Sequence, residues 1–230
     1  MNLDKLAISV YDFLGYLLPG YVVLIACSLL ESTFSGTWFL SLSLIAGNAL
    51  AFAVVAYLMG HVVHAIAAAL TQSKRLRSMI QGSSERLTDP VASVVKSELD
   101  AAYGDGIDAK GRSNLDVYLL ADAYVLASGG GVERDILIAR EGFFKQSVAA
   151  FALMTVLLIA ADLGGGVLVQ TRPGGLYPLG FWASLVLTAV AVGITALFRL
   201  RFGFYHRIKI NNTLRLFLAL RAKKDPRHER

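Results

Sequence analysis

Two histidines, His61 and His64, have the spacing in this chain that is most suggestive of chemistry. They lie three residues apart in a long apolar stretch, and this spacing places both on one face of a helix. Two imidazoles on one face can share a metal ion such as zinc. However, no Asp, Glu or Cys lies nearby in the sequence to complete a ligand set, and Cys27 is the single cysteine. We therefore favour histidines that pack or bond to backbone groups.

Two polar loops hold residues that are catalytic in other proteins, but neither completes a known pattern. Residues 105–110 (DGIDAK) are similar to the DGxxAR core of CDP-alcohol phosphotransferases, but the further aspartates of that motif are missing at the right spacing. The same loop lacks the alternating oxygen ligands and closing Glu of an EF-hand. Residues 129–131 (GGG) lack the Gly-Lys-Ser/Thr of a P-loop. We expect no enzyme activity, no metal and no cofactor.

Basic residues form two clusters, each directly after an apolar run. Lys74, Arg75 and Arg77 make the first; the second is interleaved with aromatic residues and comprises Arg199, Arg201, Arg207, Lys209 and Arg215. If the clusters converge, copies of the chain around an axis would form a basin that attracts phosphates and offers stacking faces for bases. The alternative is that these cations fix topology and contact anionic lipid headgroups.

The elements that must position these residues are membrane-spanning helices. The chain has 230 residues, 55% of them hydrophobic, and a mean hydropathy of +0.56, values that several long apolar runs explain better than a soluble core does. Residues 38–70 contain no Lys, Arg, Asp, Glu or Pro. This stretch is longer than the roughly 20 apolar residues that a bilayer requires. We predict an all-α integral membrane protein with four transmembrane helices, at residues 13–30, 38–60, 147–169 and 179–198.

The other segments are predicted to be helical as well. Residues 1–12 have the pattern of a short interfacial helix, and residues 61–70 extend the second span into the cytoplasm. Residues 71–146 are predicted to form a small helical lobe, with helices beginning at Asp89 and at Asn114. Residues 199–230 are predicted to form a basic amphipathic helix, with a possible break at Asn211-Asn212.

Helix-breaking and polar residues within the spans are candidates for a pore or a gate. Pro19 and Gly20 predict a kink or break that serves either packing or gating. Asn48, predicted to lie inside the second span, needs a polar partner and either joins helices or lines a pore. We group these three with His61 and His64 as candidate pore and gating residues.

Charge counts predict the orientation of the chain. The two short turns between spans hold one basic residue, Arg172, whereas the lobe and the C-terminal segment hold ten lysines and arginines each. Because positively charged segments stay on the cytoplasmic side, we expect the lobe and both termini to be cytoplasmic.

The opening residues 11–20 (YDFLGYLLPG), the four spans and the aromatic, basic tail together resemble small bacterial membrane effectors of anti-phage defence operons. The channel subunit of the Hailong system is the most similar member that we can name. The resemblance implies a homo-oligomeric channel in the bacterial inner membrane. It also implies that a cytoplasmic basin binds a nucleotide or single-stranded DNA oligomer made by an operon-encoded nucleotidyltransferase, and that the N-terminal segment can plug the pore.

Three functional hypotheses follow from the sequence. The first is an oligomeric channel gated by an anionic nucleotide or oligonucleotide. The second is a membrane-anchored scaffold that docks a cytosolic partner through its helical lobe. The third, a membrane enzyme that acts on lipid phosphates through His61 and His64, lacks a third ligand and is the least favoured.

Overall fold

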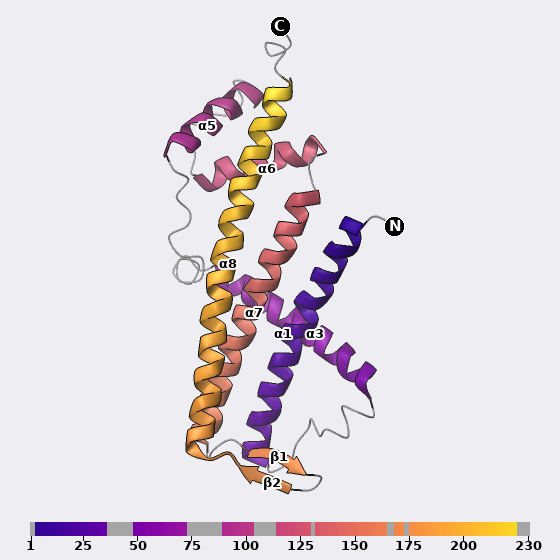
Figure 1. Cartoon of the computed structure of the whole chain (residues 1–230), viewed down its shortest axis with the longest axis vertical. Helices are drawn as coiled ribbons and strands as arrows, with labels where there is room; N and C mark the ends of the chain where they lie inside the picture. Colours follow the sequence, from indigo (N-terminus) through magenta and orange to yellow (C-terminus); the bar gives the residue numbers. More distant parts are fainter. Residues whose placement is uncertain are drawn as a thin grey trace.

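A computed structural model describes residues 3–35, 48–72, 89–103, 114–129, 132–164, 168–172 and 175–224. These residues form six helices and one two-stranded hairpin (Figure 1). The helices are α1 (Leu3–Ser35), α3 (Ala49–Gln72), α5 (Asp89–Tyr103), α6 (Asn114–Ala127), α7 (Val132–Leu163) and α8 (Phe181–Lys224). The strands are β1 (Leu168–Arg172) and β2 (Gly175–Pro178).

Four of these helices are long and apolar enough to cross a bilayer. Their apolar stretches are Phe13–Glu31 in α1, Ala49–Leu70 in α3, Arg134–Leu163 in α7 and Phe181–Lys223 in α8. The prediction of four membrane-length apolar helices is therefore confirmed, and the chain has the features of a multi-pass membrane protein.

Two predicted breaks are absent, because α1 and α8 are continuous helices in the described residues. The expected interfacial helix at residues 1–12 is instead the start of α1, which runs through Pro19 and Gly20 without a break. Helix α8 runs through Asn211 and Asn212 in the same way. In both places tertiary packing outweighs local helix propensity. Pro19 is fully buried, and Leu214, two residues after Asn212, is buried in a hydrophobic core.

The third span ends earlier than predicted. Helix α7 ends at Leu163 rather than near residue 169, and the Gly164 amide donates hydrogen bonds to the carbonyls of Ala160 and Ala161. The chain then forms the antiparallel hairpin of β1 and β2, in which Leu168 pairs with Pro178. The plain turn expected at residues 170–178 is therefore part of a strand pair, which adds a small β element to the all-α fold.

Helices α1, α7 and α8 lie along the long axis of the molecule, and α3 crosses them obliquely (Figure 1). The hairpin lies at one end and the α5–α6 pair at the other. Helix α7 is central, since it packs against α1 on one side and α8 on the other. Among the described residues, α3 packs against α1 and α7 and makes no contact with α8.

Helix α8 presents a long apolar face to its surroundings. Trp182 and Phe204 are exposed near the two ends of this face, and exposed aliphatic side chains lie between them. Their separation of 22 residues corresponds to about 33 Å of helix, close to the thickness of a bilayer core. Aromatic residues are enriched at both membrane interfaces, so the stretch 182–204 has the length of a membrane crossing. The exposed Arg199 and Arg201 lie near its Phe204 end, where long basic side chains can reach the interface.

The lobe is built on the end of α8 rather than standing as a separate domain. Helices α5 and α6 pack against α8, and their shared core consists of Val95, Leu99, Val117, Ala121, Val125, Leu214 and Phe217. The ring of Tyr124 meets Phe217 edge-on, with centroids 5.2 Å apart. The predicted lobe and the predicted C-terminal segment thus share one hydrophobic core, and α8 connects that core directly to the apolar face.

Candidate functional site

Helices α1 and α3 cross at two glycines that bring their backbones into contact. A Cβ added to Gly20 would overlap the carbonyl oxygen of Ala56 and lie 2.8 Å from the amide nitrogen of Gly60, and one added to Gly60 would overlap the carbonyl oxygen of Tyr16. Glycine lets helix backbones approach closely in this way. Of the two roles considered for the Pro19-Gly20 pair, this geometry supports packing.

Next to this crossing, both predicted histidines lie in an aromatic cluster. The ring of Tyr16 on α1 stacks on His61 with centroids 4.0 Å apart, and it lies 5.5 Å from His64. Tyr57 meets His61 edge-on at 4.8 Å. His61 is exposed and His64 is half-buried. The structure therefore brings His61 and His64 together at the place where α3 meets α1.

His64 also connects α3 to α7 through a residue that sequence reasoning missed. Nε2 of Gln146 lies 2.9 Å from Nδ1 of His64, although the two residues are 82 positions apart. Gln146 is 4% exposed, and its Oε1 has no hydrogen-bond partner among the described residues. The sequence did contain one indication of this contact. Gln146 stands directly before the predicted third span, and a polar side chain that is buried there needs a hydrogen-bond partner.

No three His, Cys, Asp or Glu side chains of the described segments are grouped in a way that could hold a metal ion. The two histidines instead use their rings for stacking and for one hydrogen bond.

A second polar cluster, centred on Glu141 of α7, joins α7 to α8. Its Oε1 lies 2.6 Å from Nδ1 of His206, and its Oε2 accepts a hydrogen bond from Nζ of Lys209 at 2.5 Å. The three side chains are only 9–15% exposed. The Lys209 ammonium also lies 5.6 Å from the ring centroid of Tyr118 on α6. Burial raises the pKa of the Tyr118 phenol, and the positive charge of Lys209 opposes this rise.

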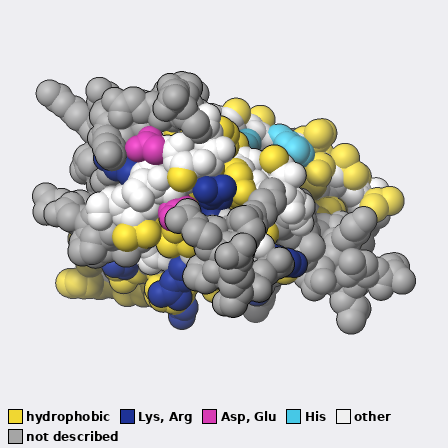
Figure 2. Space-filling view, turned by 90° about the horizontal axis from the view of Figure 1, so that it is seen from above, with side chains coloured by type: hydrophobic (Ala, Val, Ile, Leu, Met, Phe, Trp, Pro, Cys, Tyr) yellow, Lys and Arg dark blue, Asp and Glu magenta, His cyan; other side chains and the backbone are white. Residues whose placement is uncertain are grey.

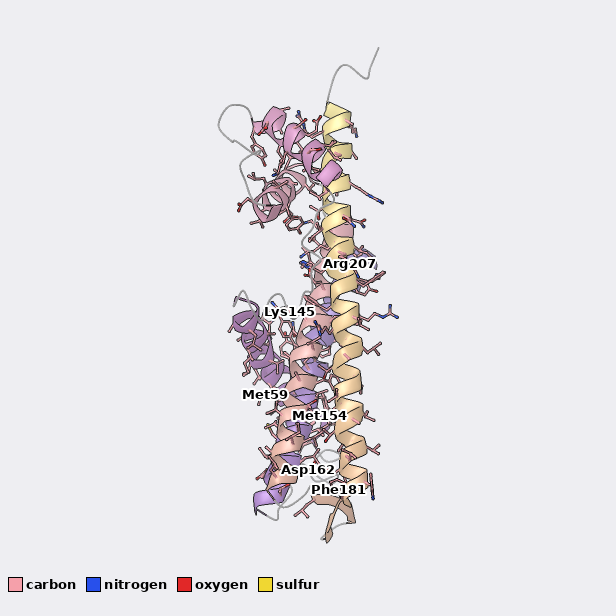
Figure 3. All side chains as sticks on the ribbon, turned by 90° about the vertical axis from the view of Figure 1, so that its left-hand side faces the viewer. Met59, Lys145, Met154, Asp162, Phe181 and Arg207 are labelled. Carbon is pink, nitrogen blue, oxygen red and sulfur yellow. The ribbon has the colours of Figure 1, made fainter. Side chains whose placement is uncertain are left out.

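The remaining predicted cations of α8 are exposed. Lys209, expected in an open basin, is the partner of Glu141, whereas Arg199, Arg201, Arg207 and Arg215 face outward. Figure 3 places Arg207 on α8 between the level of Lys145 and the lobe. Seen from the lobe end, the described lysines and arginines form separate groups rather than one patch (Figure 2). Lys74, Arg75 and Arg77, predicted to converge with them, lie outside the described residues.

Arg215 lines a hollow between α7 and α8. The hollow has a volume of about 270 Å³, and its lining comprises Arg134, Asn212, Arg215, Leu216 and Ala219. Arg134 is held in place by Asp122 of α6, with Nη2 donating to Oδ2 at 2.6 Å, and by Asp135. The bidentate pair ties the lobe to the first turn of α7.

Among the described residues, Asn48 stands directly before helix α3. It is exposed and precedes the first residue of α3, and its carbonyl accepts a hydrogen bond from the Phe52 amide at 2.9 Å. Asparagine favours this capping position because its side chain competes with helical backbone bonds. Residues 38–47 of the predicted second span lie outside the described residues, so the start of that span and the role of Asn48 within it stay predictions.

We compared the chain with protein-family models, curated proteins and solved structures, and found no match.

Proposed function

We propose that the protein is an oligomeric membrane channel, gated from its cytoplasmic side by an anionic nucleotide or oligonucleotide. The observation that carries this proposal is the continuity of α8 (Phe181–Lys224), which has a lipid-length apolar face at one end and the core of the lobe at the other. A ligand that displaces the lobe would act on this helix directly.

The lobe is also attached firmly enough to transmit such a displacement. Leu214 and Phe217 of α8 are buried in its core, and Arg134 joins α6 to α7 through Asp122. Movement of the lobe would therefore shift α7, α8 or both, rather than being absorbed by a flexible linker. Rigid packed elements of this kind carry coupling between distant sites.

Two arginines on α8 are the best placed to meet an anion. Arg207 and Arg215 are exposed beyond the membrane-length stretch, and Arg215 lines the hollow beside Arg134. Guanidinium groups bind phosphates through paired hydrogen bonds. Together with Lys74, Arg75 and Arg77, and repeated by symmetry, they would form the anion-binding basin.

The number of spans supports the oligomeric part of the proposal. In the described residues α3 and α8 do not touch, so the four apolar helices of one chain do not close a ring around a path for ions. Several copies around an axis would enclose one. The charge distribution and the resemblance to defence effectors add a bacterial inner-membrane location, cytoplasmic termini and a partner nucleotidyltransferase.

The test is ion flux through liposomes that contain the purified protein. Flux should depend on a nucleotide or DNA oligomer, and Arg207→Glu with Arg215→Glu should weaken ligand binding and reduce its dependence on salt. Lys223→Glu, an exposed charge reversal in the last turn of α8, is the matched control. Liposomes that stay ion-tight under every nucleotide condition would refute the channel.

A scaffold is the second candidate, because the lobe exposes apolar side chains to solvent. Val94 of α5 and both Leu119 and Leu126 of α6 are each about half exposed, and exposed apolar groups on a cytosolic surface fit a protein partner. A scaffold predicts that Leu119→Asp abolishes function in cells. A channel instead predicts that this variant retains ligand-dependent flux.

A further inference from the structure

We propose that Arg201 of α8 and Arg140 of α7 together bind the phosphate of an anionic membrane phospholipid, next to the ring of Tyr205. The lipid would lie where α7 and α8 pack together, at the membrane surface that faces the lobe. Such a site depends on the proposed membrane crossing of residues 182–204, but it does not depend on an ion path. It assigns Arg201 to a lipid rather than to the basin for a soluble nucleotide.

The position of Arg201 along α8 suits contact with a lipid headgroup. Arg201 lies 19 residues after the exposed Trp182, which corresponds to about 29 Å of helix and is close to the thickness of a bilayer core. On α7, Arg140 lies 23 residues before Leu163, where that helix ends, or about 35 Å. Both arginines are therefore near one edge of the core, where a long basic side chain extends toward the phosphates.

The packing of α7 against α8 brings the two arginines next to the same aromatic ring. Cζ of Arg140 lies 5.9 Å from the centroid of the Tyr205 ring, and this ring stacks on Phe144 with centroids 5.1 Å apart. Arg201 precedes Tyr205 by four residues, a spacing that makes side chains neighbours on one face of a helix. Two guanidinium groups from different helices therefore lie beside Tyr205.

The charges in this region favour an anion. Arg201 is exposed and forms no ion pair with another described residue. Glu141, the carboxylate next to Arg140 in the sequence, is bound to His206 and Lys209. Guanidinium groups bind phosphate oxygens through paired hydrogen bonds, and basic sites between membrane helices on the cytoplasmic side are typical positions for anionic headgroups.

An aromatic surface continues from the arginines toward the middle of the membrane, and it favours a lipid over a soluble phosphate. Phe198 lies three residues before Arg201 on α8, and its ring centroid is 5.8 Å from that of Phe144 and 5.4 Å from that of Phe151 on α7. All three rings are half-buried. An acyl chain attached to the bound phosphate would therefore lie against these rings.

The experiment is native mass spectrometry of the full-length protein in detergent with equal amounts of phosphatidylglycerol and phosphatidylcholine. The protein should retain phosphatidylglycerol in preference to phosphatidylcholine. Arg201→Gln should raise the Kd of the first bound phosphatidylglycerol about tenfold, the size expected when hydrogen bonds to a charged group are lost. Arg140→Gln should have a similar effect, and the two losses should not multiply because both groups hold one phosphate.

Arg199→Gln is the matched control, because Arg199 is also exposed and lies two residues from Arg201, on a different face of α8. General attraction between basic side chains and anionic lipid would make the two variants equally weak, whereas the proposed site predicts a much smaller effect for Arg199→Gln. Glycerol 3-phosphate at the same concentration should not displace the lipid, which separates a lipid site from a site for free phosphate.

Three results would overturn the site: equal effects of Arg199→Gln and Arg201→Gln, displacement by glycerol 3-phosphate, or no preference for phosphatidylglycerol. Arg201 is exposed, so its substitution should leave the fold intact, and circular dichroism of each variant checks this. Ion flux is not measured in this experiment. A failed channel assay with intact lipid binding would therefore refute only the channel.

Discussion

Helix α7 meets two neighbours through two different kinds of polar contact. Toward α8 it presents Glu141, a buried carboxylate held by His206 and Lys209. Toward α3 it presents Gln146, a neutral amide with one hydrogen bond to His64. Removing one partner of a buried ion pair costs about 3–5 kcal/mol, whereas a neutral hydrogen bond contributes about 0.5–1.5 kcal/mol.

This difference separates a firmly joined part of the molecule from a weakly joined one. Helices α7 and α8 form a fixed unit with the lobe, because Arg134 and Phe217 bind the lobe to both of them. Helix α3 is joined to α7 by one neutral hydrogen bond and one apolar cluster. Of these two polar contacts of α7, the one with α3 is therefore the weaker.

The largest effect is expected from Glu141→Ala. Without the carboxylate, Lys209 and His206 lose their partner in a site where both are at most 15% exposed. The free energy of unfolding should fall by about 3–5 kcal/mol, measured by denaturation in detergent. The control is Glu98→Ala, because Glu98 is 41% exposed and 3.5 Å from Arg221 and should lose under about 1 kcal/mol. Equal losses in the two variants would show that the cluster does not hold α7 to α8.

The next largest effect is expected from Gly60→Leu. The new side chain would overlap the Tyr16 carbonyl, which belongs to backbone that cannot move aside. Overpacking of this kind costs about 1–3 kcal/mol. Gly193→Leu is the matched control, since nothing lies within 4 Å of a Cβ at that position of α8. If both variants unfold at the same temperature, the close crossing of α1 and α3 is not needed for stability.

A smaller effect is expected from Gln146→Leu, which tests the weaker contact, that between α7 and α3. The substitution removes the bond to His64 but also removes the buried Oε1 that has no described partner. These changes oppose each other, so the free energy of unfolding should change by less than about 1 kcal/mol. A loss as large as that of Glu141→Ala would mean that α3 is held as firmly as α8.

The sequence predicted the parts of the fold that depend on local chemistry. Helices α5 and α6 begin at the predicted capping residues Asp89 and Asn114, because capping is decided within one helical turn. The four apolar stretches follow from composition alone. His61 and His64 were correctly placed on one helix.

The pairings between distant segments were not predictable in the same way. Gln146 and His64 are 82 residues apart, and Glu141 and His206 are 65 apart. No spacing pattern in the sequence relates such residues, because they meet only where the folded helices cross. For the same reason, the sequence placed Lys209 in an open basin with Arg207, although only the folded chain brings a carboxylate to it.

This last distinction leads to the smallest expected effect on stability, that of Arg207→Gln. Arg207 is exposed, and its Nε donates to the Gly203 carbonyl within its own helix at 3.3 Å. The free energy of unfolding should therefore change by less than about 0.5 kcal/mol, whereas Lys209→Gln should cost several times more. Oligonucleotide binding should show the reverse order, with Arg207→Gln lowering the salt dependence by about one phosphate contact. If Arg207→Gln leaves binding unchanged while Lys209→Gln abolishes it without unfolding the protein, the buried lysine rather than the exposed arginine is the ligand contact.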